Sequence, residues 1–176
     1  MFKTYKIKTD KHLRELLDKL KAALLNSLQI VNYPTSLRGK AAIFKWNLNY
    51  KEIDKINNEL LKNISNKAGV YLLSTYEGRR RKILYIGQTQ SKTARQRIRS
   101  HIVWRNKKTK SGKITGSQFD KVQKIIVSGK KLNFSFVEIQ PASLRHYIEE
   151  NLIEELNPPW NKHKTSKYLS ISFPIS

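Results

Sequence analysis

Residues 68–87 read AGVYLLSTYEGRRRKILYIG, and this stretch decides the fold. Two apolar runs, rich in β-branched and aromatic residues, lie on either side of the turn signal Glu77-Gly78. This pattern predicts a β-hairpin, with Tyr71 on its first strand and Tyr85 on its second. A tyrosine on a strand is most often part of a core, so the hairpin alone does not separate packing from chemistry.

The sequence after the hairpin predicts three helices and one further strand. Apolar residues recur at helical spacing in three segments, and β-branched and aromatic residues fill a fourth. Residues 105–116 lack any periodicity and are expected to form a basic loop. The expected segments are a helix over 93–104, a helix over 117–127, a strand over 132–139 and a helix over 142–156, which Pro158 and Pro159 would end.

Residues 1–66 are predicted to form a mainly helical N-terminal region. Thr9 or Asp10 can cap an amphipathic helix that runs to about Gln29. A short strand or extended segment is expected over 41–48, and a second helix over 50–64. This region could be a packing scaffold, a DNA-recognition element or a dimerisation element, and its sequence does not decide among them. The expected catalytic domain spans 67–165, and residues 166–176 would form a tail or an edge strand.

The charge of the chain points to a polyanionic partner. The 176 residues include 35 Lys and Arg against 13 Asp and Glu, a formal net charge of +22. Asp120 is the only acidic residue between positions 78 and 131, where basic residues are dense. Such a concentration favours a nucleic-acid footprint over a merely solubilising surface, because added acidic residues serve solubility better than basic ones.

Several other classes of protein are not expected. No apolar run is long enough to span a membrane, and the chain shows no charged-then-apolar leader, so a cytoplasmic protein without a membrane partner is expected. There are no cysteines, and the four histidines are too scattered for a zinc site. Any catalytic metal should therefore have oxygen ligands, and no organic cofactor is expected.

The final predicted helix carries a carboxylate on its apolar side. Glu149 has apolar residues three, four and seven positions after it, so its side chain should point inward. Burying an unpaired carboxylate is costly, which indicates an ion pair, a metal or a catalytic role. Two alternatives remain open on spacing alone. Glu155 lies on the same side of the helix as several apolar residues and could be the inward carboxylate instead. Arg145 could also form a structural ion pair with Glu149.

The helix expected over 93–104 carries candidate phosphate ligands. Arg97 and His101 lie four residues apart, so they are neighbours on one face and can reach one phosphate together. Histidine can also carry a proton near neutral pH. Arg95 and Arg99 compete with Arg97, and a helix this basic could simply follow a DNA backbone.

Five motifs, taken in order, resemble those of the GIY-YIG nucleases, a family that includes type II restriction enzymes, homing endonucleases and the incision subunit of bacterial nucleotide-excision repair. The resemblance covers about half of the chain and favours Arg97 over Arg95 and Glu149 over Glu155. The matching residues are Gly69-Val70-Tyr71, Tyr85-Ile86-Gly87, Arg97 with His101 four residues later, Glu149, and Asn161 twelve residues beyond it.

The resemblance implies an α+β fold with a small three-stranded antiparallel or mixed sheet flanked by helices. It also implies one Mg²⁺ or Mn²⁺ per active site, held mainly by Glu149, and it suggests a role for each motif residue. Tyr71 would accept a proton from the attacking water and Arg97 would neutralise the scissile phosphate. The remaining motif residues would orient or support this arrangement: Tyr85, His101 and Asn161.

We therefore expect a metal-dependent endonuclease that cleaves double-stranded DNA, with a type II restriction enzyme acting as a homodimer as the favoured setting. A homing or repair nuclease, a catalytically inactive binding module and an RNA substrate are the alternatives. Basic or polar residues around the site are expected to contact the DNA: Arg79, Arg80, Arg81, Gln88, Lys92, Arg95, Arg99, Arg105, Lys107, Lys108, Lys110 and Lys113.

Overall fold

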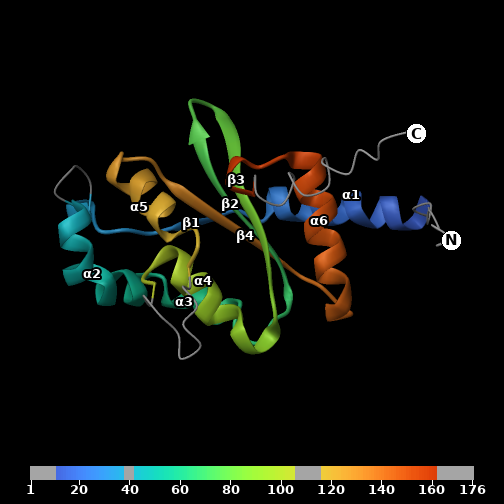
Figure 1. The fold of residues 1–176 in the computed structure, drawn as a ribbon, viewed down its shortest axis with the longest axis horizontal. Helices are drawn as coiled ribbons and strands as arrows, with labels where there is room; N and C mark the ends of the chain where they lie inside the picture. Colours follow the sequence, from blue (N-terminus) through green and yellow to red (C-terminus); the bar gives the residue numbers. More distant parts are fainter. Residues whose placement is uncertain (1–10, 38–41, 106–115, 162–176) are drawn as a thin grey trace, which may run out of the picture.

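The computed structural model describes residues 11–37, 42–105 and 116–161, which form an α+β fold (Figure 1). At its centre is an antiparallel sheet of four strands, in the order β1-β4-β2-β3. The predicted α+β class, with helices flanking a small sheet, is confirmed. The strands are β1 (Gln29–Val31), β2 (Gly69–Glu77), β3 (Arg80–Thr89) and β4 (Leu132–Glu138).

Helices cover both faces of the sheet. The pair α1 and α6 packs on one face, and α2 to α5 pack on the other, so that the sheet is the middle of three layers (Figure 1). Single 3-10 turns precede or follow several of these helices. The helices are α1 (Lys11–Asn26), α2 (Ala42–Ile56), α3 (Asn58–Asn63), α4 (Ala94–Ile102), α5 (Phe119–Val127) and α6 (Arg145–Leu156).

A hydrophobic core lies on each face of the sheet, and successive side chains of β2 point alternately into one core and the other. Val70 and Leu72 pack with α1 and α6, whereas Tyr71 and Leu73 pack with the four helices on the other face. All four side chains are at most 1% exposed. A strand covered on both faces needs no polar face, which is why this run reads as continuously apolar.

The strand expected over residues 41–48 is wrong, because α2 occupies this segment as a helix. A strand would turn Trp46 and Leu48 to the same side, but Trp46 is fully buried and Leu48 is 83% exposed. The buried partner of Trp46 on this helix is Ile53, seven residues away and on the same helical face. The helical period of α2 therefore begins earlier than the expected start at residue 50.

The N-terminal region also contributes a strand that the sequence did not indicate. The first helix ends at Asn26 rather than near Gln29, and Gln29–Val31 pairs with the start of β4. Three residues are too few for the alternating pattern of a strand to be recognised in the sequence. They form a strand because they pair with β4. Both strands of the predicted hairpin and the strand expected over 132–139 are present, and all of their pairings are antiparallel.

The hairpin has a bulge close to its tyrosines. Tyr71 lies opposite Gly87 and Leu73 opposite Tyr85, but Ser74 then pairs with Ile83, so Leu84 is an extra residue in β3. Because of this bulge, Leu84 and Tyr85 both reach the same core although they are adjacent in sequence. The turn itself is at Gly78, whose φ of +60° suits a glycine.

Within the described ranges, no helix has both the length and the apolar composition needed to cross a membrane. Most of the basic loop expected over 105–116, and the tail or edge strand expected over 166–176, lie outside the described residues.

Candidate active site

The two motif tyrosines lie side by side on the face of the sheet that α4 covers. Tyr71 is fully buried and Tyr85 is 7% exposed, and their ring centroids are 6.0 Å apart. The two tyrosines are on adjacent strands but are not directly opposite each other. Tyr71 pairs with Gly87, which is two residues after Tyr85. The tyrosines of the hairpin are therefore brought together as the sequence predicts.

Gly87 is needed because the ring of Tyr71 passes directly over it. A Cβ atom at position 87 would be 2.7 Å from both Cζ and Oη of Tyr71, which is closer than real side chains approach. A larger residue would thus displace the phenol oxygen itself. Gly69 has a different reason, since a Cβ atom there would run into the carbonyl of Val137 and the ring of Phe136 on β4.

His101 is packed between the two tyrosines and is held in its neutral form. Its ring centroid is 6.1 Å from that of Tyr71 and 5.8 Å from that of Tyr85. Burial, together with the positive charge of Arg97, lowers the pKa of His101 to about 3. The sequence-based expectation that this histidine carries a proton near neutral pH therefore does not hold in this environment.

Gln118 is a neighbour of His101 that no sequence pattern indicates. Its backbone N–H points to Nδ1 of His101 at 3.4 Å, which makes Nδ1 the acceptor and leaves the ring proton on Nε2. The contact depends on the path of the chain before α5, and no spacing rule connects position 118 with position 101. Nε2–H is thus the group that His101 can offer to a ligand.

Arg97 is the arginine of α4 that reaches the tyrosines. Its Nε lies 3.5 Å from Oη of Tyr71, at the outer limit of a hydrogen bond. Arg95 instead donates to Asn58, and Arg99 forms an ion pair with Asp54. Of the two arginines between which spacing does not decide, the structure places Arg97 next to Tyr71 and Arg95 next to Asn58.

The phenol of Tyr71 is subject to opposing influences. Burial raises the pKa of Tyr71 well above its ordinary value, and the neighbouring Tyr85 and Glu149 raise it further. Arg97 acts in the opposite direction, through both its charge and its hydrogen bond. In the protein alone Tyr71 therefore keeps its proton, and additional positive charge would be needed to lower its pKa and give the phenolate, the form that can accept a proton.

Glu149 points inward from α6, as its apolar neighbours predict. Its side chain is 1% exposed, whereas Glu150 and Glu154 are exposed. Glu155 is also on the surface, where it is paired with Lys21. Periodicity left both Glu149 and Glu155 as candidates, and the fold buries only the first of them.

Asn161 binds the backbone of β3 between the motif residues Tyr85 and Gly87. Its Oδ1 accepts from the N–H of Ile86 at 2.9 Å, and its Nδ2 donates to the carbonyl of Ile86 at 2.8 Å. Its side chain is 4% exposed. Because β3 is an edge strand, Asn161 supplies the two hydrogen bonds that a further strand would make.

Comparison with known families gives this arrangement a name. The model of the GIY-YIG catalytic domain matches residues 67–164, more than half of the chain. The chain belongs to the GIY-YIG nuclease family. A search of curated proteins finds none that matches it.

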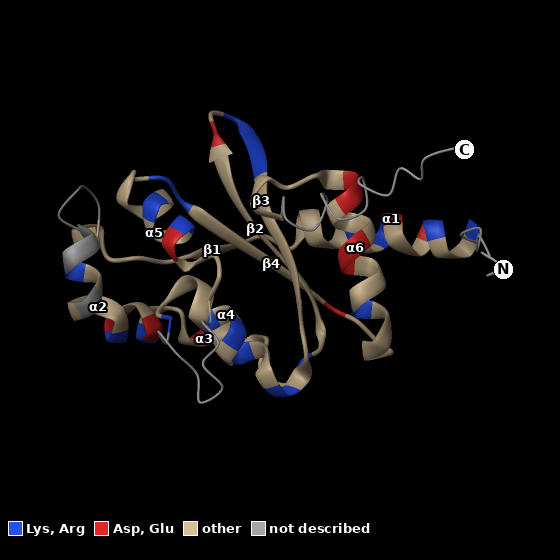
Figure 2. Ribbon diagram, in the orientation of Figure 1, with Lys and Arg blue, Asp and Glu red and all other residues tan. Residues whose placement is uncertain are grey.

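The basic residues around the GIY-YIG motifs fall into two groups at opposite ends of the hairpin (Figure 2). Arg79 and Arg80 are exposed at the turn, next to Glu77. Lys92 is exposed at the other end, where β3 leads into α4. The two groups are separated by the length of the strands, so one short stretch of DNA backbone would not contact both.

Several of the residues expected to contact DNA have partners within the protein. Arg81 donates to hydroxyls of β2 and β4 and to the carbonyl of Leu25 near the end of α1, a position that favours positive charge. Gln88 accepts from Arg145 at 2.7 Å, and Arg105 is paired with Asp120 at 2.8 Å. Four further expected contacts lie outside the described residues: Lys107, Lys108, Lys110 and Lys113.

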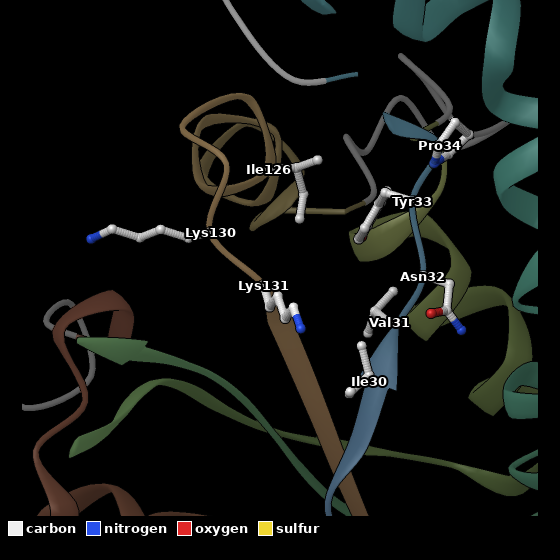
Figure 3. Close-up of a pocket in the computed structure, with 8 residues that line it drawn as sticks. All are labelled: Ile30, Val31, Asn32, Tyr33, Pro34, Ile126, Lys130 and Lys131. Carbon is white, nitrogen blue, oxygen red and sulfur yellow. The ribbon is translucent and has the colours of Figure 1, made fainter. Parts of the chain in front are cut away.

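A pocket of about 190 Å³ lies elsewhere, between β1 and α5 (Figure 3). Ile30, Tyr33 and Ile126 form much of its wall, and Lys130 points away from it toward solvent (Figure 3). Lys130 is 3.6 Å from the carboxylate of Glu77. The pocket contains none of the GIY-YIG motif residues, so it is distinct from the candidate active site.

Proposed function

We propose that this GIY-YIG nuclease is a divalent-metal-dependent endonuclease that cleaves double-stranded DNA, and that it acts as a restriction enzyme. The main support is the position of the Tyr71 phenol, which lies over Gly87 and faces Arg97 at 3.5 Å. A proton acceptor and a guanidinium side by side are what attack on a phosphodiester requires. The net charge of +22 supports a nucleic-acid substrate.

Glu149 is the residue we propose as the metal ligand. Among the described residues there is no cluster of three or more acidic, histidine or cysteine side chains, so the proposed site would rest on Glu149 with few other protein ligands. Such a donor set fits Mg²⁺, which commonly uses one or two carboxylates together with water and substrate phosphate. When bound, the ion would supply Lewis-acid stabilisation of negative charge on the scissile phosphate.

The side chains of the site would divide the remaining work. The guanidinium of Arg97 would bind non-bridging oxygens of the phosphate and stabilise the charge that develops on them. Tyr71, once deprotonated, would accept the proton of the attacking water, and Arg97 favours that deprotonation. Neutral His101 would donate from Nε2, and Asn161 would hold the strand that carries Tyr85 and Gly87.

The first test compares two tyrosines of β2. Tyr71→Phe removes one hydroxyl and should abolish cleavage of plasmid DNA in the presence of Mg²⁺, while DNA binding is retained. Tyr76→Phe is the matched control, because Tyr76 is 44% exposed on the same strand and should keep its wild-type rate. Cleavage by Tyr71→Phe at the wild-type rate would exclude Tyr71 as the proton acceptor.

The second test compares two adjacent glutamates of α6. Glu149→Gln should abolish Mg²⁺-dependent cleavage, whereas the same change at exposed Glu150 should have little effect. Digests of defined DNA with Mg²⁺ and with EDTA then separate the alternatives. Discrete fragments indicate a restriction or homing enzyme, diffuse nicks a repair-type nuclease, and retarded but intact DNA a binding module. Preferential cutting of RNA would contradict the DNA assignment.

Sequencing the cleaved ends tests the restriction setting and the homodimer together. A symmetric consensus with paired cuts on both strands is the expected result, because a two-fold dimer presents two equivalent sites. The N-terminal elements, which add β1, α2 and α3 to the family module, would supply surface for reading DNA or for contacting a second subunit. An asymmetric consensus or single-strand nicks would contradict this proposal.

A further inference from the structure

A basic pocket lies on the side of α4 that faces away from Arg97. Its volume is about 440 Å³, and its cationic lining residues are Lys92, Arg95 and Arg99. Arg95 is two positions before Arg97, which places the two side chains about 200° apart around a helix. The pocket and the tyrosine site are therefore served by opposite faces of one short helix.

The arginines of this pocket are fixed by contacts to the N-terminal helices. Nε of Arg99 is 2.9 Å from the carboxylate of Asp54 on α2, and Nη2 of Arg95 is 3.0 Å from Oδ1 of Asn58 on α3. Each contact uses part of a guanidinium that has five N–H donors, so donors remain for a ligand. The two side chains are thus already ordered, which reduces the entropy lost when an anion binds.

The balance of charge at the pocket favours an anion. None of the residues that line it is acidic, and the single carboxylate of Asp54 offsets only one of three cations. Across the described part of the chain, no acidic side chain pairs with Lys92. Lys92 is exposed, so its ammonium group is available to a ligand.

Neutral hydrogen-bond donors complete the lining. Asn66, Ser91 and Gln96 contribute amide and hydroxyl groups, which are common partners of backbone phosphates. The lining also includes the first turn of α4, and the side chain of its N-cap, Thr93, makes no capping hydrogen bond. These neutral donors add to the attraction that the three cations of the pocket exert on an anion.

We propose that this pocket binds one backbone phosphate of the DNA, separate from the phosphate that is cleaved beside Arg97. This deepens the proposed function and rests on it for the identity of the DNA. A helix with its side chains is about 10 Å across, and DNA rises about 3.4 Å per nucleotide of one strand. The bound phosphate therefore lies a few nucleotides from the scissile bond, and α4 fits against the backbone between the two.

The test measures how binding of DNA depends on salt. A fluorescent random-sequence duplex is titrated with the full-length protein in EDTA, which prevents Mg²⁺-dependent cleavage, over a series of NaCl concentrations. Lys92→Gln should weaken binding to all sequences and reduce the slope of log K against log [salt] by about 0.9, the value for one lost phosphate contact. Lys19→Gln is the matched control on exposed α1 and should keep the wild-type slope.

The outcomes separate this proposal from the proposed function. If Lys92→Gln keeps the wild-type slope while the wild-type protein cleaves DNA with Mg²⁺, the phosphate pocket is wrong and the nuclease stands. If the slope falls but the wild-type protein cleaves no DNA, the pocket is supported and the nuclease is not. An equal loss of slope for Lys19→Gln, or a Lys92-dependent preference for RNA over DNA, overturns the assignment of this pocket to DNA.

Discussion

At position 101 an imidazole that would titrate near neutral pH in water is kept neutral by its surroundings. The same burial that removes it from water places it between Tyr71 and Tyr85. In the proposed phosphate site His101 would contribute a directed N–H rather than a charge. Arg97 supplies the positive charge at this site and helps to keep His101 uncharged.

The lowered pKa of His101 predicts a specific dependence of stability on pH. His101 has a pKa of about 3 in the folded protein against 6.5 for the ordinary side chain, so between these values the unfolded state binds the additional proton. Stability from this group is complete above pH 6.5 and is lost as the pH falls toward 3. Between pH 7 and pH 5 the loss is about 2 kcal/mol.

Denaturant unfolding at these two pH values measures this loss. His101→Gln cannot titrate, so its stability should change less between pH 7 and pH 5 than that of the wild type. His146→Gln removes an exposed histidine and should retain the wild-type pH dependence. A wild-type dependence in His101→Gln would show that the proton uptake belongs to another group.

Gly87 allows a prediction about a single methyl group. Gly87→Ala places Cβ 2.7 Å from the Tyr71 hydroxyl and must move the ring, the strand or both. We expect a loss of about 1–3 kcal/mol of stability, in the range of overpacked cores, and a much larger proportional loss of cleavage. Thermal unfolding and plasmid cleavage on the same preparation measure both. Wild-type cleavage by a folded Gly87→Ala protein would contradict the assigned position of the phenol.

At the scale of elements, sequence patterns were reliable where an element is long and internally periodic. The hairpin, β4, α4, α5 and α6 were all expected close to their observed ranges. The inward side of α6 was also correct, because three apolar residues surround Glu149 at helical spacing. These features depend only on local sequence.

Features that depend on tertiary contacts were not predictable. Residues 41–48 were expected to be extended, whereas in the structure Trp46 fits beside the end of α4 as part of a helix, with Nε1 donating to the carbonyl of Val103 at 2.8 Å. The contact of Gln118 with His101 and the pairing of Asn161 with Ile86 join residues far apart in sequence. In the candidate site, spacing left Glu155 and Arg95 open beside Glu149 and Arg97, and the contacts that Gln118 and Asn161 make came only from the fold.

The pairing of Asn161 with β3 predicts local protection of one backbone amide. Asn161→Ala leaves the N–H and carbonyl of Ile86 without their side-chain partners, at a cost of about 1–3 kcal/mol for buried groups. Hydrogen exchange at the Ile86 amide should accelerate, and cleavage should fall because Tyr85 and Gly87 are its neighbours. Asn49→Ala is the control, since the side chain of half-buried Asn49 donates to the carbonyl of Lys45 within α2. Unchanged exchange at Ile86 would contradict this role.

At the scale of the whole molecule, the N-terminal elements and the GIY-YIG module share one structure. β1 completes the sheet beside β4, and the core around Tyr71 includes Trp46 and Ile53 of α2. The ion pair of Arg99 with Asp54 adds a polar connection between α4 and α2. The matched residues 67–164 therefore depend on segments that precede them.

This shared core predicts a single unfolding transition. Denaturation curves recorded by tryptophan fluorescence and by far-UV circular dichroism should coincide, as expected for one cooperative unit. Trp46→Ala should destabilise the whole protein by about 3–5 kcal/mol, because Trp46 is fully buried, and should reduce cleavage in proportion to unfolding. Leu48→Ala, on the exposed side of the same helix, is the control. Two separate transitions would show that the regions fold independently.

The side-chain amide of Asn161 has a consequence for how copies of this protein can meet. An exposed sheet edge can template another strand and lead to aggregation, but where Asn161 meets Ile86 the backbone groups of β3 are already occupied. The opposite edge is β1, which is only three residues long. A side chain thus occupies one edge of the sheet at Ile86, and the strand at the other edge is short, so both edges offer less backbone for pairing with another copy of the chain.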